Sequence, residues 1–244
     1  MSDGVILIDK PVGPTSFQMV QRVRRALGVK KVGHAGTLDP FASGLLVICV
    51  GRPATKQISR FMAGEKEYEA RMRLGVETDS QDLEGKVIRH RSVPKLSRER
   101  IDRILAGFVG ETMQTPPQYS ALKHKGKPLY YYARKGIKVV KEPRKVVIRE
   151  ISCLGSEGDT LDIRVICGKG TYIRTLAADI GEELGCGAHL FALRRLRCGN
   201  FKVGHAVPGQ ALDDRESARD LLREHLMPIE QVVIELDAED GFQE

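Results

Sequence analysis

Residues 65–74 alternate between charged and apolar side chains. Tyr68, Ala70, Met72 and Leu74 fall on one face of an extended chain, and the positions between them hold only glutamate or arginine. Successive side chains of a strand point to opposite faces, so this segment predicts a strand with one buried and one solvated face. Such strands are typical of antiparallel sheets, because helices cover both faces of parallel ones. We therefore expect an antiparallel sheet.

Further strands and helices are expected at irregular intervals. Short apolar runs predict strands at 4–9, 45–50, 146–151, 161–167 and 190–196. Apolar residues at helical spacing predict helices at 15–28, 54–62, 97–108 and 171–184. The intervals between strands are too short and too irregular for a regular series of parallel βαβ units. The sequence therefore predicts an α+β fold with a largely antiparallel mixed β-sheet flanked by helices.

The sequence argues against membrane and secreted classes of protein. The longest apolar run, at 45–50, has six residues, whereas crossing a bilayer takes about 20. The five cysteines include no Cys-x-x-Cys pair, and the six histidines show no metal-ligand spacing. We expect a cytoplasmic protein without disulfides, bound metal or membrane contact.

Positive charge is concentrated in one segment. Residues 123–145 hold nine lysines and arginines against one acid, whereas the whole chain carries a formal charge of +7. Three tyrosines at 130–132 lie inside this segment, and aromatic rings beside cations are typical of RNA-binding surfaces. A solvated face without a ligand is the alternative. Five cations are the predicted RNA contacts: Lys123, Lys125, Lys127, Arg134 and Lys135.

Glycines and prolines interrupt this basic segment, so we expect a projecting hairpin or loop with a short helix. The charge balance reverses toward the end of the chain. From Leu212 onward there are eleven acids and three arginines. This change, near Pro208, predicts that the compact body of the protein ends there.

Asp39 is the first candidate for catalysis. The residue that follows it, Pro40, favours an extended backbone at Asp39, so the carboxylate would point in a defined direction. Asp-Pro also opens ordinary turns, which is the alternative reading of this pair.

Arg174 lies in the first turn of the helix predicted at 171–184. A cation there faces the positive end of the helix dipole and is disfavoured by about 0.3–1 kcal/mol unless an anion lies nearby. Solvent can relieve this cost, or a carboxylate such as that of Asp39 can form a bidentate pair with the guanidinium.

Tyr68 is either a core residue or a ring that faces a pocket. His34 alone makes no case for catalysis.

Several segments together resemble one known family. In chain order they are 9–16, 33–40, 67–68, 75–85, 169–174 and 187–195, and the matches extend over about residues 4–200. On these motifs the chain resembles the bacterial tRNA pseudouridine-55 synthases, the TruB type. The resemblance implies the pseudouridine synthase fold with an inserted basic thumb.

The resemblance also implies an activity: isomerisation of uridine 55 in the TΨC loop of tRNA to pseudouridine, with the base flipped out of the RNA. The reaction is redox-neutral, so we expect no cofactor. Asp39 would be the essential carboxylate, Tyr68 would stack on the target base, and Arg174 would pair with Asp39. The expected substrate contacts are His34, Tyr172, Leu193, Lys10 and Arg195. Whether Asp39 attacks the ribose, attacks the base or removes a sugar proton stays open.

The resemblance divides the chain into a catalytic domain at 1–208, with the thumb at about 120–146, and an acidic extension at 209–244. Family members commonly carry a PUA domain at their C-terminal end, and here we expect it to be missing or vestigial. We expect a monomer that binds the T-arm of tRNA through the thumb. Two other functions stay open, a guide-RNA-dependent synthase of the H/ACA type and an RNA chaperone or binding module.

Overall fold

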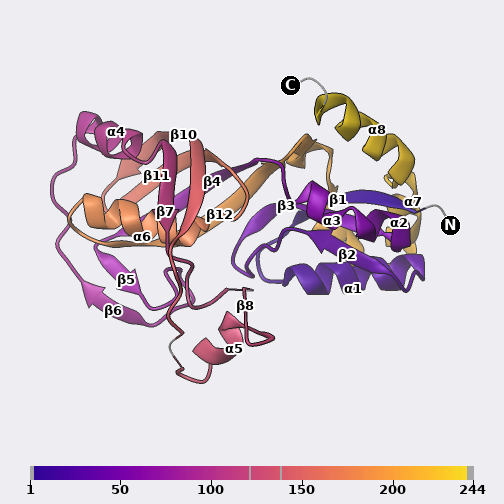
Figure 1. Cartoon of the computed structure of the whole chain (residues 1–244), viewed down its shortest axis with the longest axis horizontal. Helices are drawn as coiled ribbons and strands as arrows, with labels where there is room; N and C mark the ends of the chain where they lie inside the picture. The colour runs from indigo at the N-terminus through magenta and orange to yellow at the C-terminus, as the bar shows by residue number, and fades with distance from the viewer. Residues whose placement is uncertain (1–2, 121, 138, 241–244) are drawn as a thin grey trace. The chain divides into compact units, whose positions relative to one another are not determined.

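The computed structural model describes residues 3–120, 122–137 and 139–240, and Figure 1 shows its course. The chain forms two compact units. Unit 1 comprises residues 1–66 and 194–244, and unit 2 comprises residues 67–193. Antiparallel pairings prevail among the described strands, with parallel pairings beside them, which confirms the α+β fold with a largely antiparallel mixed sheet. Within the described ranges, no helix is long and apolar enough to span a membrane.

The sheet of unit 1 is built on two long strands. β1 (Gly4–Lys10) pairs antiparallel with β3 (Ser43–Val50) along its whole length, and β2 (Val32–Ala35) pairs antiparallel with the other edge of β3. Two later segments join in parallel: β14 (Val207–Pro208) beside β1, and the C-terminal part of β12 (Ala188–Cys198) beside β3. The predicted strands at 4–9, 45–50 and 190–196 are thereby confirmed.

Helices cover both faces of this sheet. α1 (Ser16–Leu27) and α7 (Arg215–Glu224) pack on the face that carries Ile6, Ile8, Leu46 and Ile48. α2 (Gly51–Lys56), α3 (Ile58–Phe61) and α8 (Ile229–Asp240) pack on the opposite face, in a cluster with Val5, Leu7, Leu45 and Val47. In Figure 1 α1 and α8 lie on opposite sides of these strands. Alternate residues of β1 and β3 therefore supply two separate apolar cores.

The predicted helix at 15–28 is confirmed with its signals. Thr15 caps its start in a capping box with Gln18, and Gly28 ends it with φ 67°. Helical spacing of the apolar residues predicts a buried face with Phe17, Val20, Val23 and Leu27, but Phe17 is 56% exposed, and Met19 is fully buried instead. The helix predicted at 54–62 is two short helices that meet at Gln57.

The acidic tail also belongs to the packed structure. Ala218 and Leu222 of α7 are fully buried against α1, and Val232 of α8 is 2% exposed. Short segments lead to these helices: β13 (Phe201–Lys202), the 3-10 helices at Val203–His205 and Gly209–Leu212, and β15 (Met227–Pro228). The expectation that the compact body ends near Pro208 is therefore wrong. The prediction relied on the acidic residues, which lie on the solvent face of α7, and overlooked the apolar residues on its other face.

Unit 2 contains the predicted alternating strand, β4 (Lys66–Leu74). The strand order is β12-β4-β11-β10-β7, with β11 (Thr160–Cys167), β10 (Arg144–Glu157) and β7 (Gly110–Gln114). Buried and exposed residues alternate along β4 as predicted, except that Glu67 is buried and pairs with Arg164 at 2.6 Å. The helices α4 (Arg98–Ala106), which contacts β10, and α6 (Ile173–Glu183) also belong to this unit.

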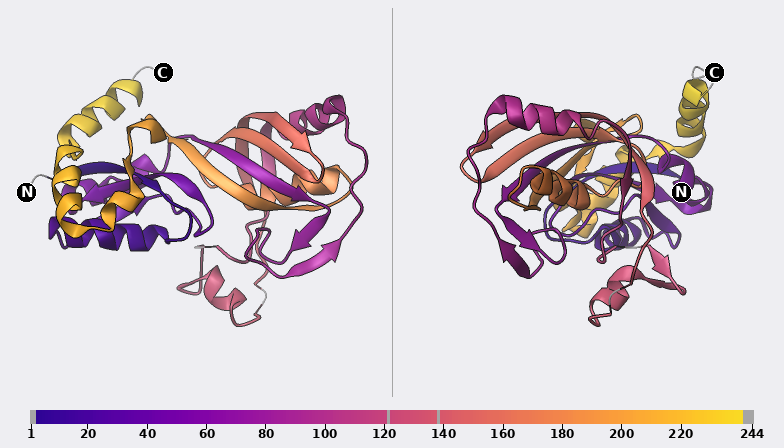
Figure 2. Two further views of the ribbon diagram at one scale, coloured as in Figure 1. Left: turned by 180° about the vertical axis from the view of Figure 1, so that it is seen from behind. Right: turned by 60° about the vertical axis from the view of Figure 1, so that its left-hand side comes forward.

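Two hairpins lie outside this sheet. β5 (Val76–Thr78) pairs with β6 (Val87–His90), and the loop between them includes residues 79–86. β8 (Lys123–His124) pairs with β9 (Lys127–Pro128) and leads into α5 (Leu129–Ala133). Both views in Figure 2 show this second hairpin and α5 apart from the sheet of unit 2. The expected hairpin with a short helix is thus confirmed, while Lys138 of the same basic segment lies outside the described residues.

Candidate active site

Asp39 lies in the loop between β2 and β3. The hydroxyl of Ser16, at the start of α1, accepts a hydrogen bond from the backbone N–H of Leu38 at 2.9 Å and lies 3.0 Å from its carbonyl oxygen. A turn follows, in which the N–H of Ala42 donates to the carbonyl of Asp39 at 3.1 Å. Leu38 and Ala42 are buried, whereas Asp39 is half-buried. These bonds fix the backbone on both sides of Asp39, which opens a turn, the alternative reading of the Asp-Pro pair. The predicted extended backbone at Asp39 stays a prediction.

Lys10 joins this loop to the segment after β1. Its side chain is fully buried, and its ammonium group donates to the carbonyls of Pro14 at 2.7 Å, Pro11 at 2.9 Å and Pro40 at 3.3 Å. The backbone N–H of Gly13 donates to Pro40 as well, at 2.8 Å. A buried ammonium group needs such partners to offset its desolvation. Lys10 therefore supports the backbone at Pro40, the residue that follows Asp39.

Arg195, on β12, joins the two ends of the same loop. It is 1% exposed, and its guanidinium donates to the carbonyls of Leu45 at 2.7 Å and Gly36 at 3.1 Å. Lys10 and Arg195 were both expected among the substrate contacts. Both are buried and bonded to the backbone around Asp39, and this arrangement was not predicted from the sequence.

Gly44 shows how tightly β12 approaches the loop. Its φ is +99°, and a Cβ atom there would lie 2.3 Å from the carbonyl oxygen of Arg195. We expect Gly44→Ala to lower the free energy of unfolding by at least about 2 kcal/mol, because strain and overlap add. Urea denaturation measures this loss. Gly199→Ala is the control, because Gly199 has φ +54° with open space around it. Equal losses for the two variants would contradict the close approach.

His34 lies on β2, close to Arg195. Its Nδ1 atom is buried and has no hydrogen-bond partner among the described residues. Burial lowers the pKa of His34 below its usual value, and the positive charge of Arg195 lowers it further. The imidazole is therefore neutral at pH 7.

This shift predicts a pH dependence of stability. Below the pKa of an unfolded histidine, about 6.5, the unfolded state binds a proton that folded His34 resists. The free energy of unfolding contributed by His34 is therefore fully present above pH 6.5 and is lost as the pH falls below it. Urea denaturation of the wild type and His34→Gln at pH 7.5 and 5.5 measures this. The wild type should lose more stability than the variant, and equal losses would contradict the prediction.

Arg174, the second residue of α6, is 4% exposed. Its guanidinium contacts the carboxylate of Asp82 at 3.1 Å and donates to the carbonyls of Ser80 at 3.1 Å and Tyr119 at 2.6 Å. Asp82 is also buried, and its carboxylate accepts from the hydroxyl of Ser80 at 2.5 Å. The anion that a cation at this end of a helix requires is thus present in unit 2.

Asp82 was not singled out from the sequence. The signal was its place in the 75–85 motif, which joins β5 to the following strand. An aspartate in a polar loop is typical of turns, so only the fold shows that it is buried beside Arg174. The expected pair between Arg174 and Asp39 would join unit 2 to unit 1 and stays a prediction.

The other predicted site residues of unit 2 lie on three elements. Tyr68, on β4, and Leu193, on β12, are each 9% exposed. Tyr172 caps the start of α6, where Gln114 of β7 holds its backbone: the N–H donates to the amide oxygen at 2.8 Å, and the amide nitrogen donates to the carbonyl at 3.0 Å. Its ring lies 5.0 Å from the guanidinium of Arg144. Tyr172 and Arg174 thus share the start of one helix.

The thumb segment carries a cluster of rings and cations. The ring centre of Tyr131 lies 4.3 Å from the ammonium group of Lys127 and 4.6 Å from that of Lys135. Hydrogen bonds from Lys135 and Lys127 lower the pKa of Tyr131 to about 8. Arg134 lies 5.4 Å from the ring centre of Tyr130. Aromatic faces and positive charge therefore occur together on this segment, as the sequence predicts.

Comparison with known proteins decides the family. The family model described as "TruB family pseudouridylate synthase (N terminal domain)" matches residues 24–173. The chain belongs to the TruB family. A second TruB-family model, "tRNA pseudouridylate synthase B C-terminal domain", matches residues 174–234, so the two matches together extend from α1 to α8. The resemblance on which the site residues were predicted is thereby confirmed, whereas their individual roles are not tested by it.

Relatives in the TruB family are similar over most of their length. A "tRNA pseudouridine synthase B" of Desulfotalea psychrophila is 63% identical over 209 residues, which cover 84% of this chain and 85% of the relative. One of Dechloromonas aromatica is 48% identical and covers 95% of this chain and 76% of the relative. Among solved structures, a Cbf5-Nop10-Gar1 complex matches with a TM-score of 0.70 and 31% identity, over 92% of this chain and 60% of that one. The pseudouridine synthase fold is thus confirmed.

Proposed function

We propose that this protein converts uridine 55 in the TΨC loop of tRNA to pseudouridine, with Asp39 as the essential carboxylate. As a TruB-family member the chain is a pseudouridine synthase, and its relatives of 63% and 48% identity are named for tRNA. In the reaction the N1–C1′ bond breaks and a C5–C1′ bond forms, while C5 loses a proton and N1 gains one. Atoms and charge balance without a redox step.

The observation that carries this proposal is the fixed position of Asp39. The loop is bonded to Ser16 before Asp39, to Lys10 after it and to Arg195 at both ends, while Asp39 itself is half-buried. A reacting group that is held in place gains rate, because little motion has to be frozen in the transition state. Lys10 and Arg195 act in this proposal as positioning residues, through the backbone of the loop.

Unit 2 supplies the predicted contacts to the uridine. We assign Tyr68 to stacking on the flipped base, and Tyr172 and Leu193 to the walls of its pocket. Arg174 is held in place by Asp82, and we assign its guanidinium to stabilising negative charge that develops during the reaction. His34, with its neutral ring, is assigned to the space that the flipped nucleotide leaves in the RNA. Flipping costs a few kcal/mol, which stacking and phosphate contacts offset.

The thumb is assigned to the T-arm of tRNA, through Lys123, Lys125, Lys127, Arg134 and Lys135. Tyr131 supports this assignment, because its ring centre lies within 5 Å of two of these cations, Lys127 and Lys135. Cations that neutralise phosphates and rings that stack on bases are the two parts of a single-strand RNA site.

Tyr131 makes tRNA binding depend on pH. As the pH rises through about 8, its hydroxyl ionises and adds a negative charge beside Lys127 and Lys135. We expect tRNA affinity to fall between pH 7 and 9 in the wild type and to fall less in Tyr131→Phe. Fluorescence anisotropy at constant salt measures the affinity. Tyr130→Phe is the matched control and should follow the wild type; identical profiles for all three proteins would contradict the prediction.

A guide-RNA-dependent synthase of the H/ACA type is the second candidate, favoured by the similarity to the Cbf5-Nop10-Gar1 complex and to a Nop10-Cbf5 complex described as an archaeal box H/ACA sRNP. The lower identity to that complex and its longer chain favour the stand-alone tRNA enzyme. The test incubates a T-arm stem-loop with the purified chain alone, without a guide RNA or other proteins. Pseudouridine is then mapped by mass spectrometry. Product at position 55 without a guide supports the proposal. A chain that is inert alone fits the second candidate, and RNA refolding without product would fit a chaperone.

A further inference from the structure

Residues 10–64 are almost free of acids. They hold nine lysines and arginines and a single acid, which is Asp39. This excess is as large as that of the thumb segment, but negative charge elsewhere in the chain hides it in the total of +7. A second basic region therefore lies in unit 1, and the structure shows which of its cations reach the surface.

Some of these cations have structural partners. Lys10 is buried, Arg22 pairs with Asp213 at 2.6 Å, and Arg60 pairs with Asp237 at 2.5 Å. Five others are exposed and form no ion pair with any residue that the structure describes. We call these five the basic rim: Arg25, Lys30, Lys31, Arg52 and Lys56.

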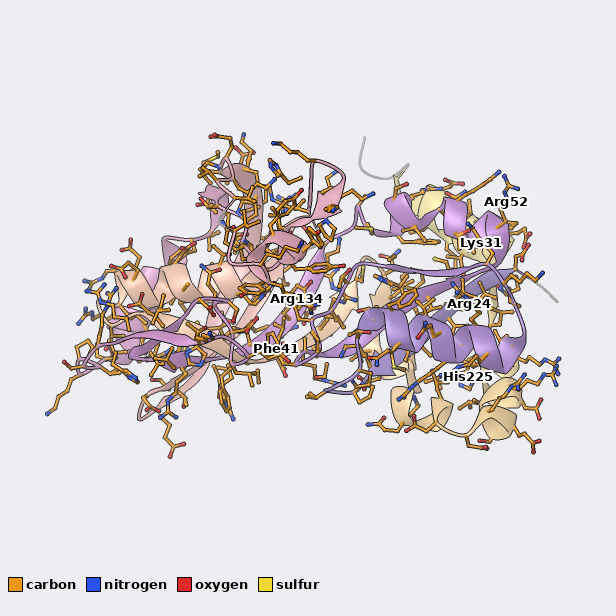
Figure 3. All side chains as sticks on the ribbon, turned by 90° about the horizontal axis from the view of Figure 1, so that it is seen from below. Arg24, Lys31, Phe41, Arg52, Arg134 and His225 are labelled. Atoms are coloured by element: carbon orange, nitrogen blue, oxygen red, sulfur yellow. The ribbon has the colours of Figure 1, made fainter. Side chains whose placement is uncertain are left out.

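The basic rim follows one end of the sheet of unit 1. The end of α1, with Arg25, lies against the start of β2, where Arg24 donates to the carbonyl of Val32 at 3.3 Å. The start of α2 lies on the other side, because the N–H of Gly51 donates to the carbonyl of Lys31 at 2.7 Å. Figure 3 shows Arg24, Lys31 and Arg52 in one row from α1 to α2.

Two acids lie beside this surface. The carboxylate of Asp3 lies against Gly51, and Glu230 lines a groove with Arg52 and Lys56. Five cations against two acids leave the rim positively charged. A strip of unpaired cations that is spread along a sheet end fits the spacing of phosphates along a nucleic-acid backbone better than it fits a single small anion.

The rim lies well away from Asp39. β3 runs for eight residues between the Asp39 loop and α2, so roughly 25 Å separate the two at about 3.3 Å per residue. An RNA whose uridine reaches Asp39 would have to continue for several base pairs before it reached the rim.

We propose that the basic rim binds the sugar-phosphate backbone of the tRNA at a second place, several base pairs away from the modified uridine. This proposal rests on the proposed function, because the polyanion it needs is the substrate RNA. The contacts carry no sequence information; they hold the RNA body while the loop enters the site. Lysines beside the edge strand β2 would also prevent edge-to-edge aggregation, and the experiment separates this role.

The experiment compares two RNAs, full-length tRNA and a minimal T-arm stem-loop, by their affinity at several salt concentrations. The variant carries Lys30→Gln, Lys31→Gln, Arg52→Gln and Lys56→Gln. We expect its Kd for tRNA to rise on the order of tenfold or more and its slope of log affinity against log salt to fall by about 3, at 0.7–0.9 per phosphate contact. Its Kd for the stem-loop and its kcat with saturating tRNA should match the wild type.

The matched control removes four exposed cations elsewhere: Lys95→Gln, Arg103→Gln, Arg215→Gln and Arg219→Gln. An equal salt slope for rim variant and control would overturn the proposal, and aggregation without a change in slope would leave edge protection as the role of the rim. If the variant with four substitutions does not fold, the single variants Lys31→Glu and Arg52→Glu take its place. Because binding needs no turnover, a wild type that forms no pseudouridine would refute the proposed function and still allow the rim to be tested.

Discussion

Asp39→Asn should abolish pseudouridine formation, with kcat reduced by at least about 10³-fold. Asparagine has the size of aspartate but is neither a nucleophile nor a base at neutral pH. The loop is held through the backbone of Leu38, Pro40 and Ala42, so the substitution leaves its supports in place. Release of tritium from C5-labelled uridine in tRNA measures the rate, because C5 loses its proton when it bonds to C1′.

Binding and stability are the controls for this variant. The Kd for tRNA and the urea midpoint of Asp39→Asn should stay close to the wild type, because the basic surfaces and the apolar cores are unchanged. A variant that retained even a tenth of the wild-type rate would contradict the role assigned to Asp39. A variant that lost rate and fold together would show that the carboxylate also supports the loop.

The second large effect is expected at Arg174. Arg174→Ala leaves the carboxylate of Asp82 buried without its cation and removes the donor to the carbonyls of Ser80 and Tyr119. Breaking a buried ion pair in this way typically costs about 3–5 kcal/mol in the free energy of unfolding. We also expect kcat to fall by about 10²–10³-fold, the usual loss for one preorganised donor, with the Kd for tRNA nearly unchanged.

A double variant separates the structural and catalytic parts of this effect. Arg174→Met with Asp82→Leu replaces both charges by apolar groups, and such replacements are often neutral for stability. Urea denaturation should therefore show recovery of most of the lost free energy, while kcat stays at the level of Arg174→Ala. Recovery of kcat together with stability would show that Arg174 acts only through the fold.

The sequence predicted elements whose signals are local. The strand β4 alternates with period two, and α1 has a cap at Thr15 and a terminating glycine at Gly28, so both were expected at the right place. The helix at 54–62 was expected as one piece, because the break at Gln57 is not marked by a proline or a glycine in the sequence. Signals of this kind depend only on neighbouring residues.

Features that depend on distant residues were not predicted. Lys10 and Arg195 resembled substrate contacts, yet their partners are carbonyls on segments that come together only in the fold. The acidic surface of α7 concealed Ala218 and Leu222, which fill the core beneath α1. The Asp-Pro pair alone does not distinguish Asp39 from an ordinary turn residue. Only the several motifs together, which indicate the family, make it a candidate for catalysis. A single residue type has many roles, and its long-range partners decide among them.

Unit 1 is assembled from the two ends of the chain. Its first strand, β1, pairs with β15 through Gly4 and Val5, and the loop of Asp39 is braced by Arg195. A ribosome therefore releases the whole of unit 2 before the brace emerges, whereas unit 2 is continuous and can fold during synthesis. A nascent chain would expose the thumb before Arg195 can hold the loop of Asp39 in place. If Asp39 has the proposed role, its loop gains this brace only after residue 195 has been synthesised.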